Sequence, residues 1–294
     1  MKEKNMTAFI SLFVRAYHNK DKNIKVFNDK YADTILSKKE YEEIKKNLIS
    51  GIKFFNSNFK GNKEETIKWI VNKQIGPSIL GRSAFNKRTL DNAIKLGCKE
   101  YIVYASGYDS SSLDYNIDSF EIDKPEIIND KIERIKSIRK DNIKYIGADL
   151  SEDNWIDGLK YNNYKNDKIS HSSLLGISYY LSKEEFSILI KNISKNTCNG
   201  SSIVFDFQTL DQSSETQKNE ILASGANQEM KSKYSYQEIE KILSDNNLRI
   251  YEYLDDKQIT NEFFYDYNTL NPDCTIIAPK GIAYILAVKN NFDI

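Results

Sequence analysis

Cysteine, histidine and proline are scarce in this chain, and its charges cancel. Its 294 residues include three cysteines, two histidines and four prolines, and 42 basic residues balance 42 acidic ones. Cys98, Cys198 and Cys274 are widely separated and odd in number, which excludes a disulfide framework and a paired-cysteine metal site and is typical of a reducing cytoplasm. Balanced charge gives no general attraction to nucleic acid or anionic membranes. We expect a cytoplasmic protein with a small-molecule partner, no nucleic acid and no membrane.

Long hydrophobic runs are also missing. The apolar stretch from Thr7 to Val14 ends at Arg15 and lacks a small-residue cleavage pattern, so we do not interpret it as a signal peptide. No segment is long enough to span a bilayer. The few prolines and glycines mark no linker, and a chain of this length is compatible with one α/β unit that carries extra helices.

The first hundred residues have the periodicity of helices. Apolar side chains recur at helix spacing near the amino terminus, namely at Phe9, Leu12, Phe13, Ala16 and Tyr17. Further helices are predicted at 39–55, 64–73 and 78–96, the last one ended by Gly97. We predict a helical cap over residues 1–97 that forms one compact unit with a sheet-containing core at 98–294.

From Tyr101 onward, predicted strands alternate with helices. Strands are expected at 101–104, 119–122, 143–148, 169–177, 202–207, 248–254 and 282–288. Capping boxes, Ser182 with Glu185 and Ser235 with Glu238, mark the starts of two helices, whereas no strong helical pattern separates the last two strands. This order predicts an α/β fold with a seven-stranded, mostly parallel sheet whose last strand is antiparallel. The polar stretch 209–233 is predicted to be a lid or loop insertion.

The segment 101–123 has the pattern of two parallel strands around a nucleoside-binding turn. The first strand ends in Ala105, Ser106 and Gly107, and the second ends in Asp123. Ligands of open α/β sheets bind at the carboxyl ends of strands, where a carboxylate one strand over accepts hydrogen bonds from ribose hydroxyls. The single glycine disfavours a dinucleotide-dependent oxidoreductase and favours an adenosyl ligand without phosphate, such as S-adenosylmethionine. An ordinary core strand that ends at Gly107 explains the same residues equally well.

Other motifs, in the same order along the chain, resemble one family. They are Arg82, A-S-G-Y-D at 105–109, F-E-I-D-K-P at 120–125, A-D-L-S at 148–151 and Y-Y-L at 179–181, preceded by R-A-Y at 15–17 and V-F-N-D-K-Y-A at 26–32. Together they resemble the leucine carboxyl methyltransferase family, including its bacterial polyketide O-methyltransferase branch. The resemblance implies a Rossmann-like class I methyltransferase fold with an N-terminal helical cap. It also implies an S-adenosyl-L-methionine cofactor and O-methyl transfer to a carboxylate or hydroxyl of a small molecule.

The resemblance assigns cofactor-binding roles to residues on three elements. Arg82 would pair with the methionine carboxylate of the cofactor, where a guanidinium can bind both oxygens; a surface or interdomain salt bridge is the alternative. Ala105, Ser106 and Gly107 would let the backbone lie against the cofactor. Asp123 would accept hydrogen bonds from the ribose hydroxyls, a role compatible with capping the helix that follows.

Four further residues lie near the expected adenine and methyl positions. Asp149 and Leu150 would contact the adenine, although Asp149 could instead start a turn with the serine at position 151. Tyr179 and Tyr180 follow the fourth strand, close to the expected methyl group, where an aromatic is more often part of a core. His171 is the only histidine placed to act as a base, and a hydrogen-bonded structural role is the alternative. No catalytic residue and no metal ligand is therefore assigned.

Two positions depart from the family pattern. Ser111 stands where the family usually has an arginine, and Leu175 stands where it usually has a glutamate close to the cofactor amino group; no acidic residue lies between 170 and 181. These departures favour a second hypothesis, in which the chain is a catalytically silent relative of methyltransferases that binds a nucleoside or a protein partner.

Overall fold

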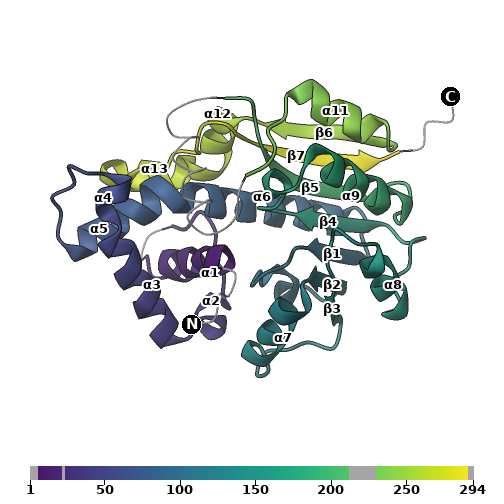
Figure 1. Cartoon of the computed structure of the whole chain (residues 1–294), viewed down its shortest axis with the longest axis horizontal. Helices are drawn as coiled ribbons and strands as arrows, with labels where there is room; N and C mark the ends of the chain where they lie inside the picture. The colour runs from purple at the N-terminus through teal and green to yellow at the C-terminus, as the bar shows by residue number, and fades with distance from the viewer. Residues whose placement is uncertain (1–5, 22–23, 212–229, 291–294) are drawn as a thin grey trace.

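The computed structural model describes residues 6–21, 24–211 and 230–290. It contains a seven-stranded sheet with the strand order β3-β2-β1-β4-β5-β7-β6 and helices packed against it (Figure 1). The strands are β1 Glu100–Tyr104, β2 Asp118–Asp123, β3 Ile143–Gly147, β4 Ser170–Leu174, β5 Ser202–Gln208, β6 Leu248–Leu254 and β7 Ile282–Lys289. Strands β1 to β5 pair in parallel, and β7 is antiparallel to both β5 and β6. The predicted α/β fold with an antiparallel last strand is confirmed.

Two of the amino-terminal helices begin at capping residues. The helices of this region are α1 Met6–Asn19, α2 Ala32–Ile35, α3 Lys38–Ser50, α4 Ile52–Phe55, α5 Lys63–Ile70, the π-helix η1 Val71–Ile75 and α6 Gly76–Lys95. Ser37 and Asn62 form capping boxes at the starts of α3 and α5, which satisfy backbone N–H groups that the first helical turn leaves free. After α6, Gly97 has a φ of +102°, as expected for the glycine that follows a helix.

Two layers of helices cover the sheet. The helices α8 Asn154–Tyr161, α9 Lys183–Lys195 and α11 Tyr236–Ser244 share one hydrophobic cluster with the inward side chains of the strands. Helix α6 packs against β4, β5 and β7, and α7 Pro125–Arg134 contacts β2 and β3. Both predicted capping boxes, at the starts of α9 and α11, are present.

Two local predictions are wrong. The fourth strand ends at Leu174 rather than 177, because the chain turns at Gly176, whose φ is +71°. The stretch between the last two strands is helical: it contains α12 Asp256–Ile259, the π-helix η4 Thr260–Phe264 and α13 Tyr265–Leu270. Each piece is too short to show a helical repeat in the sequence, and only the capping box of Asp255 with Gln258 marks the start.

The helical cap is built from both ends of the chain. One hydrophobic cluster joins α1, α3, α5 and α6 to η4, α13 and β7, through side chains that include Phe13, Ile67, Phe85, Phe264 and Tyr284. The division into 1–97 and 98–294 stays a prediction. The predicted lid at 209–233 lies mostly outside the described residues. In the ranges that the structure describes, no helix combines the length and apolar character needed to cross a membrane.

Candidate functional site

The turn after β1 presents bare backbone at the carboxyl edge of the sheet. Ala105 and Gly107 have φ values of +52° and +49°, a region that residues with a Cβ rarely adopt. The backbone N–H of Ser106 donates to the carbonyl of Ile122 at 3.0 Å, which ties the turn to β2. A Cβ built on Gly107 would meet only the Cβ of Ala8, at 3.4 Å. Ala105 thus has a strained conformation in a turn that is hydrogen-bonded to β2. Such strain is typical of sites where the backbone approaches a ligand closely.

Asp123, the last residue of β2, is held by that turn. Its Oδ2 accepts a hydrogen bond from the N–H of Gly107 at 2.6 Å, and its Oδ1 accepts one from the N–H of Lys124 at 2.7 Å. Burial raises the pKa of Asp123, and the two N–H groups act in the opposite direction. Each carboxylate oxygen has a second lone pair and can accept a further hydrogen bond. Asp123 is therefore held in place at the turn and keeps the capacity to accept further hydrogen bonds.

Asp149 and Leu150 lie next to this turn, after β3. The N–H of Ala148 donates to the carbonyl of Asp123 at 2.9 Å, so the ends of β2 and β3 are adjacent. Asp149 accepts hydrogen bonds from the N–H and the hydroxyl of Ser151, at 3.0 and 2.8 Å, which lower its pKa. This is the turn that the sequence offers as the alternative role, yet the side chain of Asp149 remains 42% exposed. Leu150 is partly buried against the core.

Arg82 comes from α6 and covers the turn after β4. Its guanidinium lies over Gly176, where a Cβ would meet Nη1 at 2.5 Å. Nη1 donates to the Tyr179 hydroxyl at 3.1 Å, and Nη2 donates to the Ser11 hydroxyl at 3.4 Å. Nη1 is also 3.5 Å from Oδ2 of Asp206. Arg82 thus forms a largely buried salt bridge between the predicted cap (1–97) and the predicted core (98–294), at the same end of the strands as Asp123.

Asp206 lies beside Arg82 and is not among the residues that the sequence predicts for the site. It is the fifth residue of β5 and is completely buried. The signal in the sequence is an acidic residue inside the apolar run I-V-F-D-F near the carboxyl end of a predicted strand. A buried carboxylate is costly and needs partners. An acidic residue in this apolar strand therefore indicates a specific interaction, although the sequence does not identify the partners.

Helix α1 links the two halves of the site. Ala8 faces Gly107, and Ser11 accepts the hydrogen bond from Arg82; residues three apart lie on one face of a helix. One turn further along α1, Nη2 of Arg15 donates to the carbonyl of Tyr108 at 2.8 Å. The face of α1 that carries Ala8 and Ser11 therefore lies over the glycine turn and the Arg82 guanidinium together.

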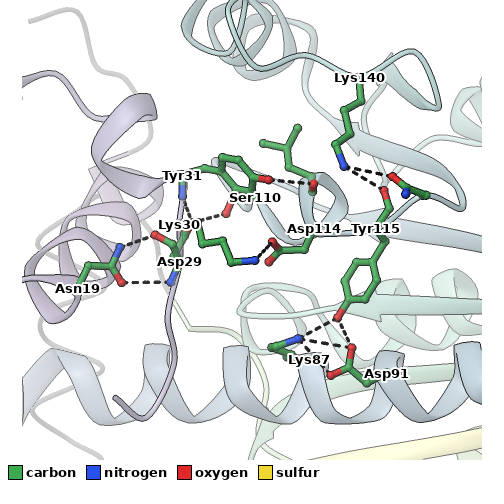
Figure 2. Close-up of polar contacts among 12 residues, drawn as sticks. Asn19, Asp29, Lys30, Tyr31, Lys87, Asp91, Ser110, Asp114, Tyr115 and Lys140 are labelled. Carbon is green, nitrogen blue, oxygen red and sulfur yellow. Dashed lines mark hydrogen bonds and ion pairs between the residues drawn. The ribbon is translucent and has the colours of Figure 1, made fainter. Parts of the chain in front are cut away.

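A buried ion pair holds α1 over the glycine turn. Nε of Arg15 is 2.7 Å from Oδ2 of Asp29, and neither side chain is more than 6% exposed. Figure 2 shows how Asp29 also accepts the Ser110 hydroxyl, at 2.5 Å, and the N–H of Tyr31, at 3.0 Å. The exposed pair Lys30 with Asp114 lies beside them. Asp29 thus joins α1 to the loop that continues the glycine turn.

The structure does not bring His171 to the site. His171 is the second residue of β4, near the amino end of the strand. Its Nδ1 lies 2.8 Å from the Ser202 hydroxyl and its Nε2 3.5 Å from the Thr89 hydroxyl. Burial lowers the pKa of His171 to about 3, so the ring is neutral at pH 7. The structural role that was the alternative is the one that these contacts support.

Ser111 and Tyr179 also have defined partners. The Ser111 hydroxyl contacts Asp109 and the hydroxyl of Tyr101, the latter at 3.0 Å. The Tyr179 ring is buried and packs edge-on against Tyr180, with centroids 4.8 Å apart. Burial raises the pKa of both tyrosines, so neither is a base at neutral pH. Among the described residues, no group of His, Cys, Asp and Glu is arranged to hold a metal ion.

Comparison with known proteins identifies the family. The family described as "Leucine carboxyl methyltransferase" matches residues 8–194. The "Putative S-adenosyl-L-methionine-dependent methyltransferase YktD" of Bacillus subtilis (strain 168) is 32% identical over 306 residues, which cover 98% of each chain.

Two solved structures share the fold. A "putative methyltransferase" from Thermobifida fusca YX has a TM-score of 0.60 at 13% identity and covers 99% of this chain and 97% of its own. A DUF574 family protein from Streptomyces avermitilis MA-4680 has a TM-score of 0.56 at 12% identity and covers 83% of this chain and 96% of its own. The match over 8–194 and the relative along nearly the whole chain confirm the resemblance seen in the sequence: this chain belongs to the leucine carboxyl methyltransferase family.

Proposed function

We propose that this protein transfers the methyl group of S-adenosylmethionine to a carboxylate or hydroxyl oxygen of a small molecule. The chain is a methyltransferase by its family, and a relative along 98% of its length is described as S-adenosyl-L-methionine-dependent. The observation that carries the proposal is the 2.6 Å hydrogen bond from the Gly107 N–H to Asp123, which joins a bare turn and an oriented carboxylate at the ligand-binding edge.

The residues at this edge fit the cofactor. Asp123 keeps free lone pairs for the ribose hydroxyls, and Ala105 and Gly107 hold the backbone in a shape that accepts a close ligand. Asp149 is exposed enough to reach the adenine amine, with the backbone of Leu150 beside it. Arg82 offers a guanidinium to the methionine carboxylate. When bound, S-adenosylmethionine supplies an activated methyl group on a sulfonium sulfur.

The protein contributes alignment and exclusion of water. Good alignment of two reacting groups can lower a barrier by about 7–11 kcal/mol, and the face of α1 over the turn limits access of solvent. A carboxylate acceptor, with a pKa of about 4, is ionised at pH 7 and needs no base, whereas a phenol with a pKa of about 10 benefits from one. His171 lies near the amino end of β4 and contacts Ser202 and Thr89, so it supplies no base at this edge, and the proposal favours a carboxylate acceptor.

Calorimetry with S-adenosylhomocysteine tests the cofactor site. The wild-type protein should bind this product, and Asp123→Ala and Arg82→Ala should each weaken binding at least about tenfold, since each removes a charged hydrogen-bonding group. Asp118→Ala is the matched control, because Asp118 is an exposed carboxylate at the other end of the same strand. Absence of heat with wild-type protein whose circular dichroism spectrum is native would contradict the proposal.

Mass spectrometry tests the acceptor. Incubation with S-adenosylmethionine and separate pools of small carboxylic acids, phenols and amines should yield a product 14 mass units heavier in an oxygen-acceptor pool. Methylation confined to amines would overturn the O-methyl assignment. The alternative of a catalytically silent protein, which Leu175 and Ser111 favour, requires weak cofactor binding and no product in any pool.

A further inference from the structure

We propose that Asp206 binds the ammonium group of the cofactor, so that Arg82 and Asp206 together recognise the amino-acid end of S-adenosylmethionine. The inference rests on the proposed function, because it assumes that this edge of the sheet holds the cofactor. It adds a residue on β5 to the predicted cofactor-binding residues, which lie on α6, in the turns after β1 and β3 and at the end of β2.

One oxygen of Asp206 has no hydrogen-bond donor. Oδ1 accepts the N–H of Gly176 at 2.6 Å. Oδ2 is buried and accepts no hydrogen bond from any residue that the structure describes. An ionised oxygen in this state is costly, and such groups in native proteins call for an explanation. A ligand that brings a donor to Oδ2 would remove the cost.

Arg82 does not fill this role itself. Its Nη1 is 3.5 Å from Oδ2, which is longer than an N–H···O hydrogen bond. The same nitrogen already donates to the Tyr179 hydroxyl at 3.1 Å. The two charged groups are thus neighbours, and Oδ2 of Asp206 remains available as an acceptor.

This arrangement matches the chemistry of an α-amino acid. The methionine end of the cofactor carries a carboxylate and an ammonium group on one carbon, so its binding site needs a cation and an anion side by side. Arg82 and Asp206 are such a pair, and an ammonium group has three donors for an oxygen like Oδ2. Arg82 would bind the carboxylate, and Asp206 the ammonium.

The backbone places Asp206 at the expected turn. β4 and β5 are adjacent and parallel, with Leu174 opposite Phe205, so Asp206 lies beside the start of the turn at Leu175 and Gly176. The Ser178 hydroxyl donates to the carbonyl of Asp206 at 2.5 Å and fixes the end of β5 to that turn. A carboxylate from the neighbouring strand thus reaches the region in which Leu175 supplies none.

The test varies the protein and the ligand together. Calorimetry is carried out on the wild-type protein and on Asp206→Asn with two ligands: S-adenosylhomocysteine and its deaminated analogue, 4-(5′-adenosylthio)butanoate, which keeps the carboxylate. In the wild-type protein, removal of the ammonium group should weaken binding about 10- to 100-fold, the range for a buried charge-assisted hydrogen bond. Asp206→Asn should weaken binding of S-adenosylhomocysteine similarly and bind the analogue almost as the wild type does.

Glu100→Gln is the matched control. Glu100 is also fully buried at 0% exposure, accepts one backbone N–H, from Lys165, and has a second oxygen without a donor. Glu100 is the first residue of β1 and lies at the amino-terminal ends of the strands, away from Asp206. This variant should therefore keep the preference for the ligand with the ammonium group.

Each other outcome overturns the inference. Equal binding of both ligands by the wild-type protein excludes an ammonium contact, and this comparison needs no variant, so it stands even if Asp206→Asn does not fold. Equal weakening of both ligands in Asp206→Asn means that Asp206 only positions Arg82. Absence of S-adenosylhomocysteine binding in the wild type overturns the proposed function as well, which separates the two failures.

Discussion

Gly176 decides where the Arg82 guanidinium can lie. Its φ of +71° and the 2.5 Å separation between a built Cβ and Nη1 of Arg82 leave no space for a side chain. We predict that Gly176→Ala displaces Arg82, lowers the affinity for S-adenosylhomocysteine at least tenfold and destabilises the fold by about 1–3 kcal/mol, the cost of a strained backbone. Calorimetry and urea unfolding measure the two effects.

Gly97→Ala separates strain from displacement. Gly97 also has a positive φ, of +102°, but no atom lies within 4 Å of a built Cβ. This variant should lose stability and keep its affinity for S-adenosylhomocysteine. A Gly176→Ala protein that binds the ligand as tightly as the wild type would show that the position of Arg82 does not matter for binding.

Contacts between residues of one sequence motif could be predicted, and contacts between residues that meet only in space could not. The pairing of Gly107 with Asp123 follows from two short strands and the turn after the first, all within 101–123. Asp206 meets Arg82 only because β5 lies beside β4 and α6 crosses both. The sequence shows Asp206 in an apolar strand, but its contact with Arg82 depends on how α6 packs against the sheet. No local sequence pattern predicts that packing.

At the scale of elements, the Arg15–Asp29 pair holds α1 against the loop after β1. We predict that Asp29→Asn costs about 3–5 kcal/mol in the free energy of unfolding, because it leaves a buried guanidinium without its charged partner. The affinity for S-adenosylhomocysteine should fall as well, since α1 also carries Ser11 next to Arg82. Urea unfolding and calorimetry measure these changes.

Lys30 supplies the control from the same segment. Its ammonium pairs with Asp114 at 3.0 Å, but the Lys30 side chain is 65% exposed. Lys30→Met should change the free energy of unfolding by less than about 1 kcal/mol, as is usual for exposed ion pairs. If Asp29→Asn were no more harmful than Lys30→Met, the buried pair would not hold α1 in place.

Elements with a long repeat or a clear cap could be predicted, and short broken ones could not. The capping boxes at Ser182 and Ser235 gave the starts of α9 and α11. The segment from α12 to α13 is broken by a π-helix, so no apolar stripe runs through it. Its residues Phe264 and Tyr267 are buried against the cap, and this tertiary packing, rather than a local repeat, explains its helical form.

At the scale of the whole molecule, Glu100 makes stability depend on pH. Burial raises its pKa to about 7 in the folded protein, against an ordinary value of about 4.3 in the unfolded chain. Between these values the folded state binds more protons than the unfolded state, so the free energy of unfolding falls as pH rises. We predict that Glu100→Gln removes part of the loss in stability between pH 5 and pH 8.

Urea unfolding of both proteins at pH 5 and pH 8 measures this effect. The two histidines act in the opposite direction, because burial lowers the pKa of His18 to about 4 and that of His171 to about 3. Their contribution cancels when the variant is subtracted from the wild type. A difference between the two proteins that stays constant from pH 5 to pH 8 would contradict the predicted ionisation of Glu100.

The topology of the sheet was the most predictable feature of the molecule. Five strand-and-helix units followed by two strands allow few arrangements once parallel crossovers are right-handed, and the antiparallel β7 follows from that ending. The membership of α12 to α13 in the cap was not predictable, because it brings residues near 260 against the first helices.

The position of β7 between β5 and β6 makes the molecule depend on its final strand. Among the residues that the structure describes, β6 pairs with no strand except β7, and β5, which carries Asp206, would become an edge strand without β7. During synthesis, the anionic half of the Arg82–Asp206 pair therefore stays on an unfinished strand edge until Ile282–Lys289 has left the ribosome. A stop codon or a protease cut before Ile282 would remove β7 from the sheet and leave β6 without its partner. The exposed edge of β5 would then be prone to aggregation.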